Sequence, residues 1–213
     1  MTEAEIAALR EGARSPAICG PQDLGAAASD LSAAFATYPM FEWVIRDDPR
    51  RDQGRLRLFN LMMHGMASDG LVLRPPSGGA AAVWIHSDKL APTPFWDELR
   101  ALPTLLSATG LRRFGRLAAL RAGMDKHHPT DRPHVYLWLL GVRPEAQGYG
   151  VGSRLLQAGL EWVDTQGLPA FLETSTEENV ALYRRHGFEV ISEYLCAPDS
   201  PPSWAMWRET RRA

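Results

Sequence analysis

The sequence predicts an α/β (mixed α+β) domain, with a mixed β-sheet that carries helices on its faces. Residues 134–142, HVYLWLLGV, are almost entirely apolar, which is typical of a strand covered on both faces. Strand and helix patterns then alternate from residue 134 to 196, the order from which such sheets are built. We find no internal repeat and no linker long enough to separate two domains. We therefore expect a single domain over 16–213, preceded by an N-terminal arm at 1–15.

The N-terminal arm reads as a short helix or a frayed end, and a short strand is expected near residues 17–19. Two helices are predicted after this strand. In residues 22–38, apolar residues recur at spacings of three and four, with Asp23 as the expected N-cap and Pro39 as the expected stop. A second helix is expected over residues 48–66. The apolar stripes are Leu24, Ala28, Leu31 and Phe35 in the first helix, and Leu56, Phe59, Met63 and Met66 in the second.

Two strands, at 71–75 and 80–87, are predicted to be joined by a PSGG turn. Residues 88–130 have a helical period, interrupted at Pro103 and Gly110. After the apolar strand at 134–142, we expect a helix over 150–165, a strand at 170–175, a helix over 177–186 ended by Gly187, and strands at 188–196 and 202–210. The residues expected to face inward from the 150–165 helix are Val151, Leu155, Leu156, Leu160 and Val163.

Charge and composition argue against several kinds of partner. The formal net charge is −2, so no overall positive field attracts nucleic acid or an anionic membrane. No run of about 20 apolar residues is present, and the N-terminus does not read as a signal peptide, so we expect a cytoplasmic protein. The sequence leaves the oligomeric state open between a monomer and a homodimer. His127 and His128 are adjacent and cannot converge on one ion, which predicts no metal site. The central arginines, Arg112, Arg113, Arg116 and Arg121, are expected to form a solvated face.

The glycines at 148, 150 and 152 stand where a helix should begin. The first turn of a helix has unpaired amide groups and a partial positive charge, and glycines there allow a phosphate to approach the backbone. The stretch therefore predicts a diphosphate site made of main-chain amides. It is neither the dinucleotide fingerprint nor a P-loop. The alternative is that the glycines only let the strand and the helix pack closely.

Three linked motifs resemble those of the GCN5-related N-acetyltransferase (GNAT) superfamily. QGYGVG (147–152) is similar to its motif Gln/Arg-x-x-Gly-x-Gly/Ala, VRP (142–144) is similar to the preceding strand exit, and NVALYRRHGF (179–188) is similar to its second signature. The resemblance implies a GNAT fold, with a central mixed, largely antiparallel sheet of about six or seven strands and helices on both faces. It also implies acetyl-CoA as the co-substrate.

The same resemblance implies where acetyl-CoA binds. The pyrophosphate is expected on the amides from Gln147 to Ser153, and the pantetheine arm beside residues 140–142. The amide of Val142 is expected to donate to the thioester oxygen, and Asn179 to the pantetheine arm. The cofactor-binding residues implied are Leu140, Gly141, Val142, Gln147, Gly148, Tyr149, Gly150, Val151, Gly152, Ser153 and Asn179.

Glu173 is the candidate base and Tyr183 the candidate acid for attack of an amine on the thioester in a ternary complex. A carboxyl with a pKa near ~4.3 is a weak base for an ammonium, but partial burial would raise that pKa. A phenol with a pKa near ~10 is protonated at pH 7 and can protonate a departing thiolate. The alternatives are that Glu173 pairs with an arginine and that Tyr183 is only a packed core residue.

The acceptor is expected to be a primary amine of a small molecule. Within the superfamily, LSAAFATYP (31–39) and several later segments resemble the puromycin N-acetyltransferases, with a weak match between about 88 and 131. Tyr38, Trp84 and Trp138 are the candidate walls of the acceptor pocket, although tryptophans on strands are usually core residues. A protein or peptide acceptor, or a non-catalytic acyl-CoA sensor, stays an alternative.

Overall fold

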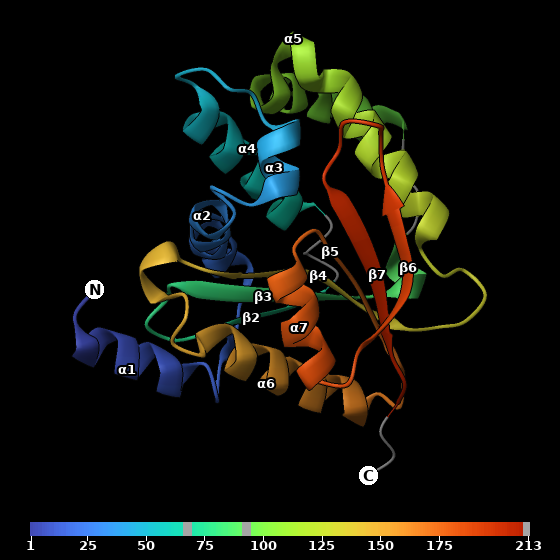
Figure 1. Cartoon of the computed structure of the whole chain (residues 1–213). Coiled ribbons are helices and arrows are strands. Elements are labelled where there is room, and N and C mark those ends of the chain that lie inside the picture. The colour runs from blue at the N-terminus through green and yellow to red at the C-terminus, as the bar shows by residue number, and fades with distance from the viewer. Residues whose placement is uncertain (66–69, 91–94, 211–213) are drawn as a thin grey trace.

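A seven-stranded sheet runs through the middle of the computed structural model, which describes residues 1–65, 70–90 and 95–210 (Figure 1). The strands lie in the order β1-β2-β3-β4-β5-β7-β6. Neighbouring strands are antiparallel except β4 and β5, which are parallel. The strands are β1 (Ala17–Ile18), β2 (Leu71–Arg74), β3 (Ala80–His86), β4 (Val135–Val142), β5 (Ala170–Thr174), β6 (Glu189–Leu195) and β7 (Pro202–Arg208).

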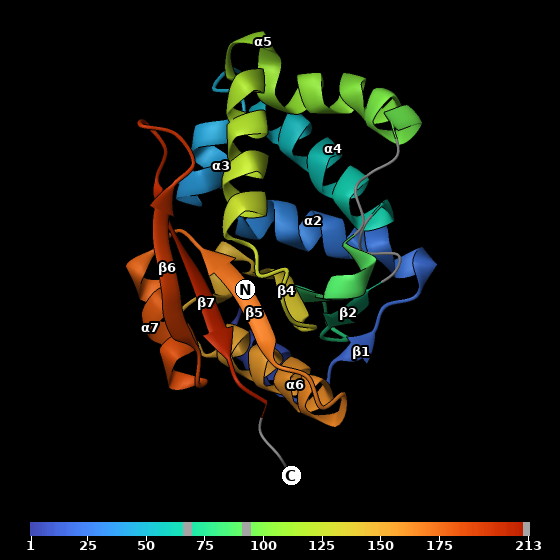
Figure 2. The same cartoon turned by 90° about the vertical axis from the view of Figure 1, so that its right-hand side faces the viewer.

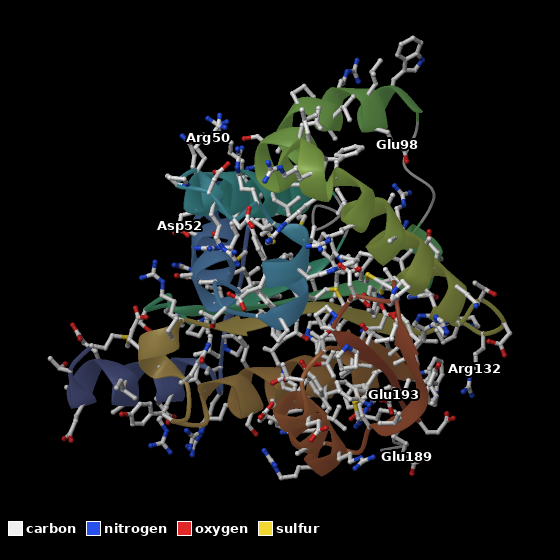
Figure 3. The ribbon with its side chains drawn as sticks, turned by 45° about the horizontal axis from the view of Figure 1, so that its top comes forward. Arg50, Asp52, Glu98, Arg132, Glu189 and Glu193 are labelled. Atoms are coloured by element: carbon white, nitrogen blue, oxygen red, sulfur yellow. The ribbon has the colours of Figure 1, made fainter. Side chains whose placement is uncertain are left out.

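Helices cover both faces of the sheet (Figures 1 and 2), as the resemblance implied. One face carries α1, α6 and α7, and the other carries α2 to α5. The helices are α1 (Glu3–Gly12), α2 (Leu24–Ala34), α3 (Pro39–Val44), α4 (Arg51–His64), α5 (Phe95–His127), α6 (Val151–Thr165) and α7 (Glu177–Arg185). Short 3₁₀ turns occupy Pro21–Asp23, Ser87–Lys89 and Pro144–Ala146. The edge strand β6 presents the exposed Glu189 and Glu193 (Figure 3), charges that disfavour pairing with another strand.

The core face of α6 is the one predicted, since Val151, Leu155, Leu156, Leu160 and Val163 are all buried. Leu9 and Ala13 of the N-terminal segment lie in the same apolar cluster. On the opposite face, Leu24, Ala28, Leu31, Phe59 and Met63 pack on β2, β3 and β4. The sheet is therefore buried on both sides around β3 and β4, which explains the apolar sequence of β4.

Three details of the first helices differ from prediction. Pro39 does not end the first helix, because α2 stops at Ala34 and Pro39 begins α3. Asp23 occupies the N-cap position of α2 as predicted, but its carboxylate makes no cap bond; it accepts instead from the Gly20 main-chain N–H at 3.0 Å and closes the preceding turn. Leu56 is 39% exposed, and Leu58 is buried in its place. Met66 lies outside the described residues.

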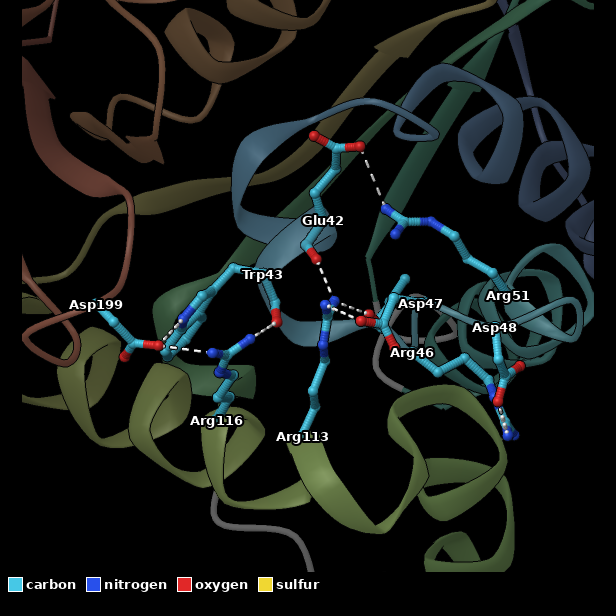
Figure 4. A network of polar contacts seen from close by, with 10 residues as sticks. Glu42, Trp43, Arg46, Asp47, Asp48, Arg51, Arg113, Arg116 and Asp199 are labelled. Carbon is cyan, nitrogen blue, oxygen red and sulfur yellow. Dashed lines mark hydrogen bonds and ion pairs between the residues drawn. The ribbon is translucent and has the colours of Figure 1, made fainter.

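Helix α5 continues through Pro103 and breaks at Gly110, whose φ is 65°. Its arginines do not form a purely solvated face (Figure 4). Arg113 donates to the carbonyls of Glu42 and Ile45 at 2.7 and 2.6 Å, and Arg116 donates to the carbonyl of Trp43. These bonds satisfy carbonyls at the end of α3, which a helix leaves without partners. The arginines thus attach α5 to α3.

The contact between α6 and β3 yields a stability prediction. A Cβ added at Gly159 would lie 2.2 Å from Nε1 of the fully buried Trp84. We expect Gly159→Ala to lower the free energy of unfolding by about 1–3 kcal/mol, measured by urea denaturation. Gly25→Ala in α2 is the matched control: its Cβ meets nothing within 4 Å, so it should stabilise by up to about 1 kcal/mol. Equal effects of the two changes would contradict this packing.

Candidate active site

Strand β4 carries a bulge at its centre. Val83 of β3 pairs with Leu139, but the next residue, Trp84, pairs with Leu137, so Trp138 is an extra residue. Trp138 and Leu139 consequently both pack on the α2 side of the sheet. A bulge bends a strand and increases its twist. The bulge lies directly after Leu137, the last residue of β4 that pairs with β5.

Beyond the bulge, β4 and β5 separate. Their ladder contains three pairs and ends at Leu137 opposite Leu172, while β4 runs on to Val142. Successive amides of a strand point to alternate sides, so those of 138–142 that point away from β3 have no strand partner among the described residues. Of the predicted residues, Leu140 and Val142 present their amides at this open edge, whereas the amide of Gly141 points to the β3 side, as does that of Arg143, which donates to the carbonyl of Gly79. A ligand with amide groups can pair along it as an added strand would.

Gly141 and Gln147 fix the exit of β4. A Cβ at Gly141 would lie 2.8 Å from Cβ of Ala34, so the missing side chain allows α2 to approach the strand. The side chain of Gln147 donates from Nε2 to the carbonyl of Val142 at 2.9 Å. Gln147 therefore braces the loop against the end of the strand.

The glycine loop adopts backbone angles that favour glycine. Gly148 and Gly150 have φ values of 80° and 78°. An added Cβ at either position would meet nothing within 4 Å, and one at Gly152 would meet only Val142, at 3.4 Å. Close packing of strand and helix therefore does not explain Gly148 and Gly150, and that alternative is wrong. These two glycines turn the chain into α6 and leave the surface above it open.

The N-terminus of α6 has no side-chain cap among the described residues. Its first amides are therefore available to an anion. The hydroxyl of Ser153 bonds Nε2 of His186 at 2.8 Å, which ties α6 to the end of α7. Tyr149 is 52% exposed, whereas the side chain of Val151 lies in the core, so only its amide can take part. Asn179 occupies the first turn of α7, where its main-chain N–H donates to Oγ1 of Thr176.

Glu173 lies on β5 at the end of the β4–β5 ladder, and two phenols hold its carboxylate. Tyr136 donates to Oε2 at 3.0 Å, and Tyr194 donates to Oε1. Burial raises the pKa of Glu173 to about 7, although both phenols act to lower it. The described residues show no arginine paired with it, contrary to that alternative. A carboxyl with this pKa can exchange protons near neutral pH.

Tyr183 lies on α7, on the other face of the sheet from Glu173. It is 6% exposed and packs edge-to-face on Phe188. Burial raises the pKa of Tyr183 above its usual value, and the nearby Tyr38 raises it further, so the phenol stays protonated. Leu172 belongs to the cluster of Tyr183, whereas Phe171 belongs to that of Tyr136 and Tyr194. Strand β5 thus separates the two candidate groups.

The structure places two of the three predicted acceptor residues on the same face of the sheet. Tyr38 accepts from the amide of Ser175 and bonds Oγ1 of Thr174 at 3.1 Å, so it lies at the open end of β5. Trp138 is half-buried on the same face. Trp84 is fully buried against α6 on the other face, so its assignment to the pocket wall is wrong.

Sequence analysis missed the phenols that hold Glu173. Tyr136 is a polar-tipped residue in a strand that otherwise reads as apolar, whereas Tyr194 lies in a strand that also carries Glu189, Ser192 and Glu193, so the sequence pattern singles out only Tyr136. It also missed that His128 and His134 bond each other at 3.0 Å, next to Tyr136. Burial lowers the pKa of His128 to about 4, so this pair is neutral at pH 7.

The described residues contain no group of three or more His, Cys, Asp or Glu placed to hold a metal ion. Nor do they include a helix long and apolar enough to cross a membrane.

Comparisons with known proteins address this arrangement. Residues 85–188 match the model of the acetyltransferase (GNAT) family. A solved structure described as histone acetyltransferase HPA2 and related acetyltransferase, from Corynebacterium glutamicum, has a TM-score of 0.67 at 24% identity and covers 93% of this chain and 98% of that one. The family match covers residues 85–188, just under half of this chain, and the solved structure shares its fold.

Two further relatives bear on the ligands of GNAT proteins. The NatC complex bound to Gag peptide and CoA has a TM-score of 0.52 at 11% identity, covering 92% of this chain and 97% of that one. A mycothiol acetyltransferase from Paenarthrobacter aurescens is 41% identical over 69 residues, which are 30% of this chain. The match spans about a fifth of that relative (21%). The comparisons do not show the resemblance to the puromycin N-acetyltransferases.

The raised pKa of Glu173 predicts a stability difference that depends on pH. Because the folded state keeps this carboxyl protonated up to about pH 7 and the unfolded chain only to about 4.5, ionisation of Glu173 destabilises the fold as pH rises through that window. We expect Glu173→Gln to gain stability relative to the wild type between pH 4.5 and 7, by at most about 3 kcal/mol. Urea denaturation at several pH values measures this, and a difference independent of pH would contradict it.

Proposed function

We propose that this protein is an acetyl-CoA-dependent N-acetyltransferase that acetylates a primary amine of a small molecule. The observation that carries the proposal is the open edge of β4, which leads directly to the uncapped, glycine-opened N-terminus of α6. A diphosphate fits that helix end by charge, and the amide groups of a pantetheine arm fit the strand edge. Glu173 and Tyr183 flank this path from opposite faces of the sheet.

Each residue has one step in the proposed reaction. Glu173 accepts a proton from the amine, directly or through one water, which frees the nitrogen lone pair. The nitrogen attacks the thioester carbonyl carbon, and an amide of the β4 edge, that of Val142, donates to the carbonyl oxygen as it becomes negative. The new C–N bond forms, the C–S bond breaks, and Tyr183 protonates the departing thiolate. The nitrogen loses its second proton as the acetamide forms, and that proton returns the Tyr183 phenolate to the neutral phenol through solvent. The products are an acetamide and a free thiol.

The acceptor is the least constrained part of the proposal. Segments resembling the puromycin N-acetyltransferases favour a small amine, and so does the aromatic group that surrounds Tyr38, where Phe35 and Phe41 lie 5.2 and 6.3 Å from it between ring centroids. The alternatives are a protein or peptide amine and a non-catalytic acyl-CoA sensor. A base with a pKa near 7 and a protonated phenol favour an enzyme, since a sensor needs neither. Thiol release measured over a panel of amines, puromycin included, distinguishes these alternatives. We also propose a cytoplasmic location and a monomer or homodimer.

The proposed diphosphate site at the glycine loop and the N-terminus of α6 can be tested by binding. Acetyl-CoA should raise the melting temperature of the wild type, and Gly150→Glu should abolish that rise because it places a carboxylate where the diphosphate binds. Gly167→Glu is the matched control: Gly167 has a φ of 65°, an equally open Cβ position, and lies just beyond the other end of α6. The control should lose similar stability yet keep the response to acetyl-CoA. If acetyl-CoA raised the melting temperature of Gly150→Glu as much as that of the wild type, a diphosphate site at this helix end would be excluded.

The acid can be tested by kinetics. Tyr183→Phe keeps the buried ring and removes only the proton that the thiolate would receive. We expect kcat to fall about a hundredfold or more, with the Kd for acetyl-CoA changed less than about threefold. Single-turnover kinetics and isothermal titration calorimetry measure the two quantities. An unchanged kcat would remove Tyr183 from the mechanism.

A further inference from the structure

The two phenols reach Glu173 from different strands. Tyr136 lies on β4, directly beside β5, whereas Tyr194 lies on β6, separated from β5 by β7. Each phenol donates to a different oxygen of the carboxylate. One oxygen alone would leave the carboxylate free to rotate about its last bond. Two donors from opposite sides fix its plane.

Each phenol is itself held in place. The ring of His127 stacks on Tyr194 with centroids 3.8 Å apart and planes 7° apart, and His127 is bonded through Nδ1 to the carbonyl of Gly123 in α5. Tyr136 is buried and lies 5.5 Å from Phe171 between ring centroids. The two donors are therefore set by the fold rather than drawn in by the carboxylate.

We propose that Tyr136 and Tyr194 are positioning residues for the reaction, which orient the Glu173 carboxylate and favour its charged form. This inference rests on the proposed function, in which Glu173 accepts the proton of the amine. A carboxyl as buried as this one favours its neutral form, which cannot accept a proton. Hydrogen bonds from two phenols stabilise the anion specifically, because charge-assisted bonds are stronger than neutral ones. The hydrogen bonds from Tyr136 and Tyr194 thus allow the buried carboxyl of Glu173 to act as a base.

The other groups near Glu173 do not supply this effect. Asp125 of α5 acts against its ionisation by like charge. Burial raises the pKa of the Cys196 thiol, which stays neutral, and the neutral His128 contacts the ring of Tyr136. His127 contacts Tyr194 rather than the carboxylate, and β7 places Ala205 opposite Glu173. Tyr38 bonds the end of β5 instead. Among the described residues, the two phenols are the donors to this carboxylate.

The test is the pH dependence of kcat/KM in Tyr136→Phe and Tyr194→Phe. Loss of either donor should move the acidic limb to higher pH by about one unit, which is about a tenfold loss at pH 6. The plateau at high pH should stay within about twofold, because Glu173 is ionised there in every variant. The substrate amine titrates identically with every enzyme variant. The ratio of kcat/KM between variant and wild type therefore reports only the ionisation of Glu173.

A second background separates positioning from folding. In Glu173→Gln, adding Tyr194→Phe should cause no further loss, because there is no carboxylate to hold. Cys196→Ala, which alters packing beside Tyr194 and removes no donor to Glu173, should keep the wild-type pH profile. Melting temperatures confirm that each variant is folded.

Two outcomes would overturn the inference. A loss that is uniform across pH, or one that persists in the Glu173→Gln background, would show that the phenols serve only the fold. Wild-type activity in Glu173→Gln alone would instead refute the proposed role of Glu173, and this inference with it. A large loss in Glu173→Gln without any pH shift in the phenylalanine variants would refute only the positioning role.

Discussion

The candidate site depends on the separation of β4 from β5 after Leu137. A parallel pair that stayed in register would use every backbone group of β4 and leave nothing for a ligand. The bulge at Trp138 re-aims the strand, and the close approach of α2 at Gly141 gives its outer half a new packing partner. β3 still pairs with that half as far as Val142. The strand is therefore stable without β5, and its free edge is a consequence of the fold.

Burial acts on both candidate groups in the same direction, with opposite chemical results. It raises the pKa of Glu173, so that the carboxyl becomes a stronger base, and it raises that of Tyr183, so that the phenol keeps its proton. The two groups lie on opposite faces of β5, and the same physical cause prepares one to accept a proton and the other to donate one.

Local patterns predicted the local features. The apolar run of β4, the inward stripe of α6 and the glycine loop each depend on residues near in sequence, and the structure has all three. The features that failed depend on distant partners. Pro39 ends or begins a helix according to how α3 packs, and Arg113 is drawn from solvent by carbonyls some 70 residues away. Trp84 faces α6 because of the register of β3. The hydrogen bonds of Tyr136 and Tyr194 to Glu173 join residues of three strands, and no spacing in the sequence predicts them.

The comparisons divide the chain in a way that matches this chemistry. The family match covers residues 85–188, which include β4, the glycine loop, α6, β5 and α7, and hence both Glu173 and Tyr183. It leaves out α2, α3 and α4, which pack over the open end of the sheet. Tyr38, at the junction of α2 and α3, bonds the end of β5 and so connects the unmatched part to the matched part. The parts of the site that would bind acetyl-CoA and transfer the acetyl group thus come from the shared segment. In the proposed function, the helices that precede the shared segment would help to select the acceptor, and a relative matched over the shared segment alone does not identify the amine.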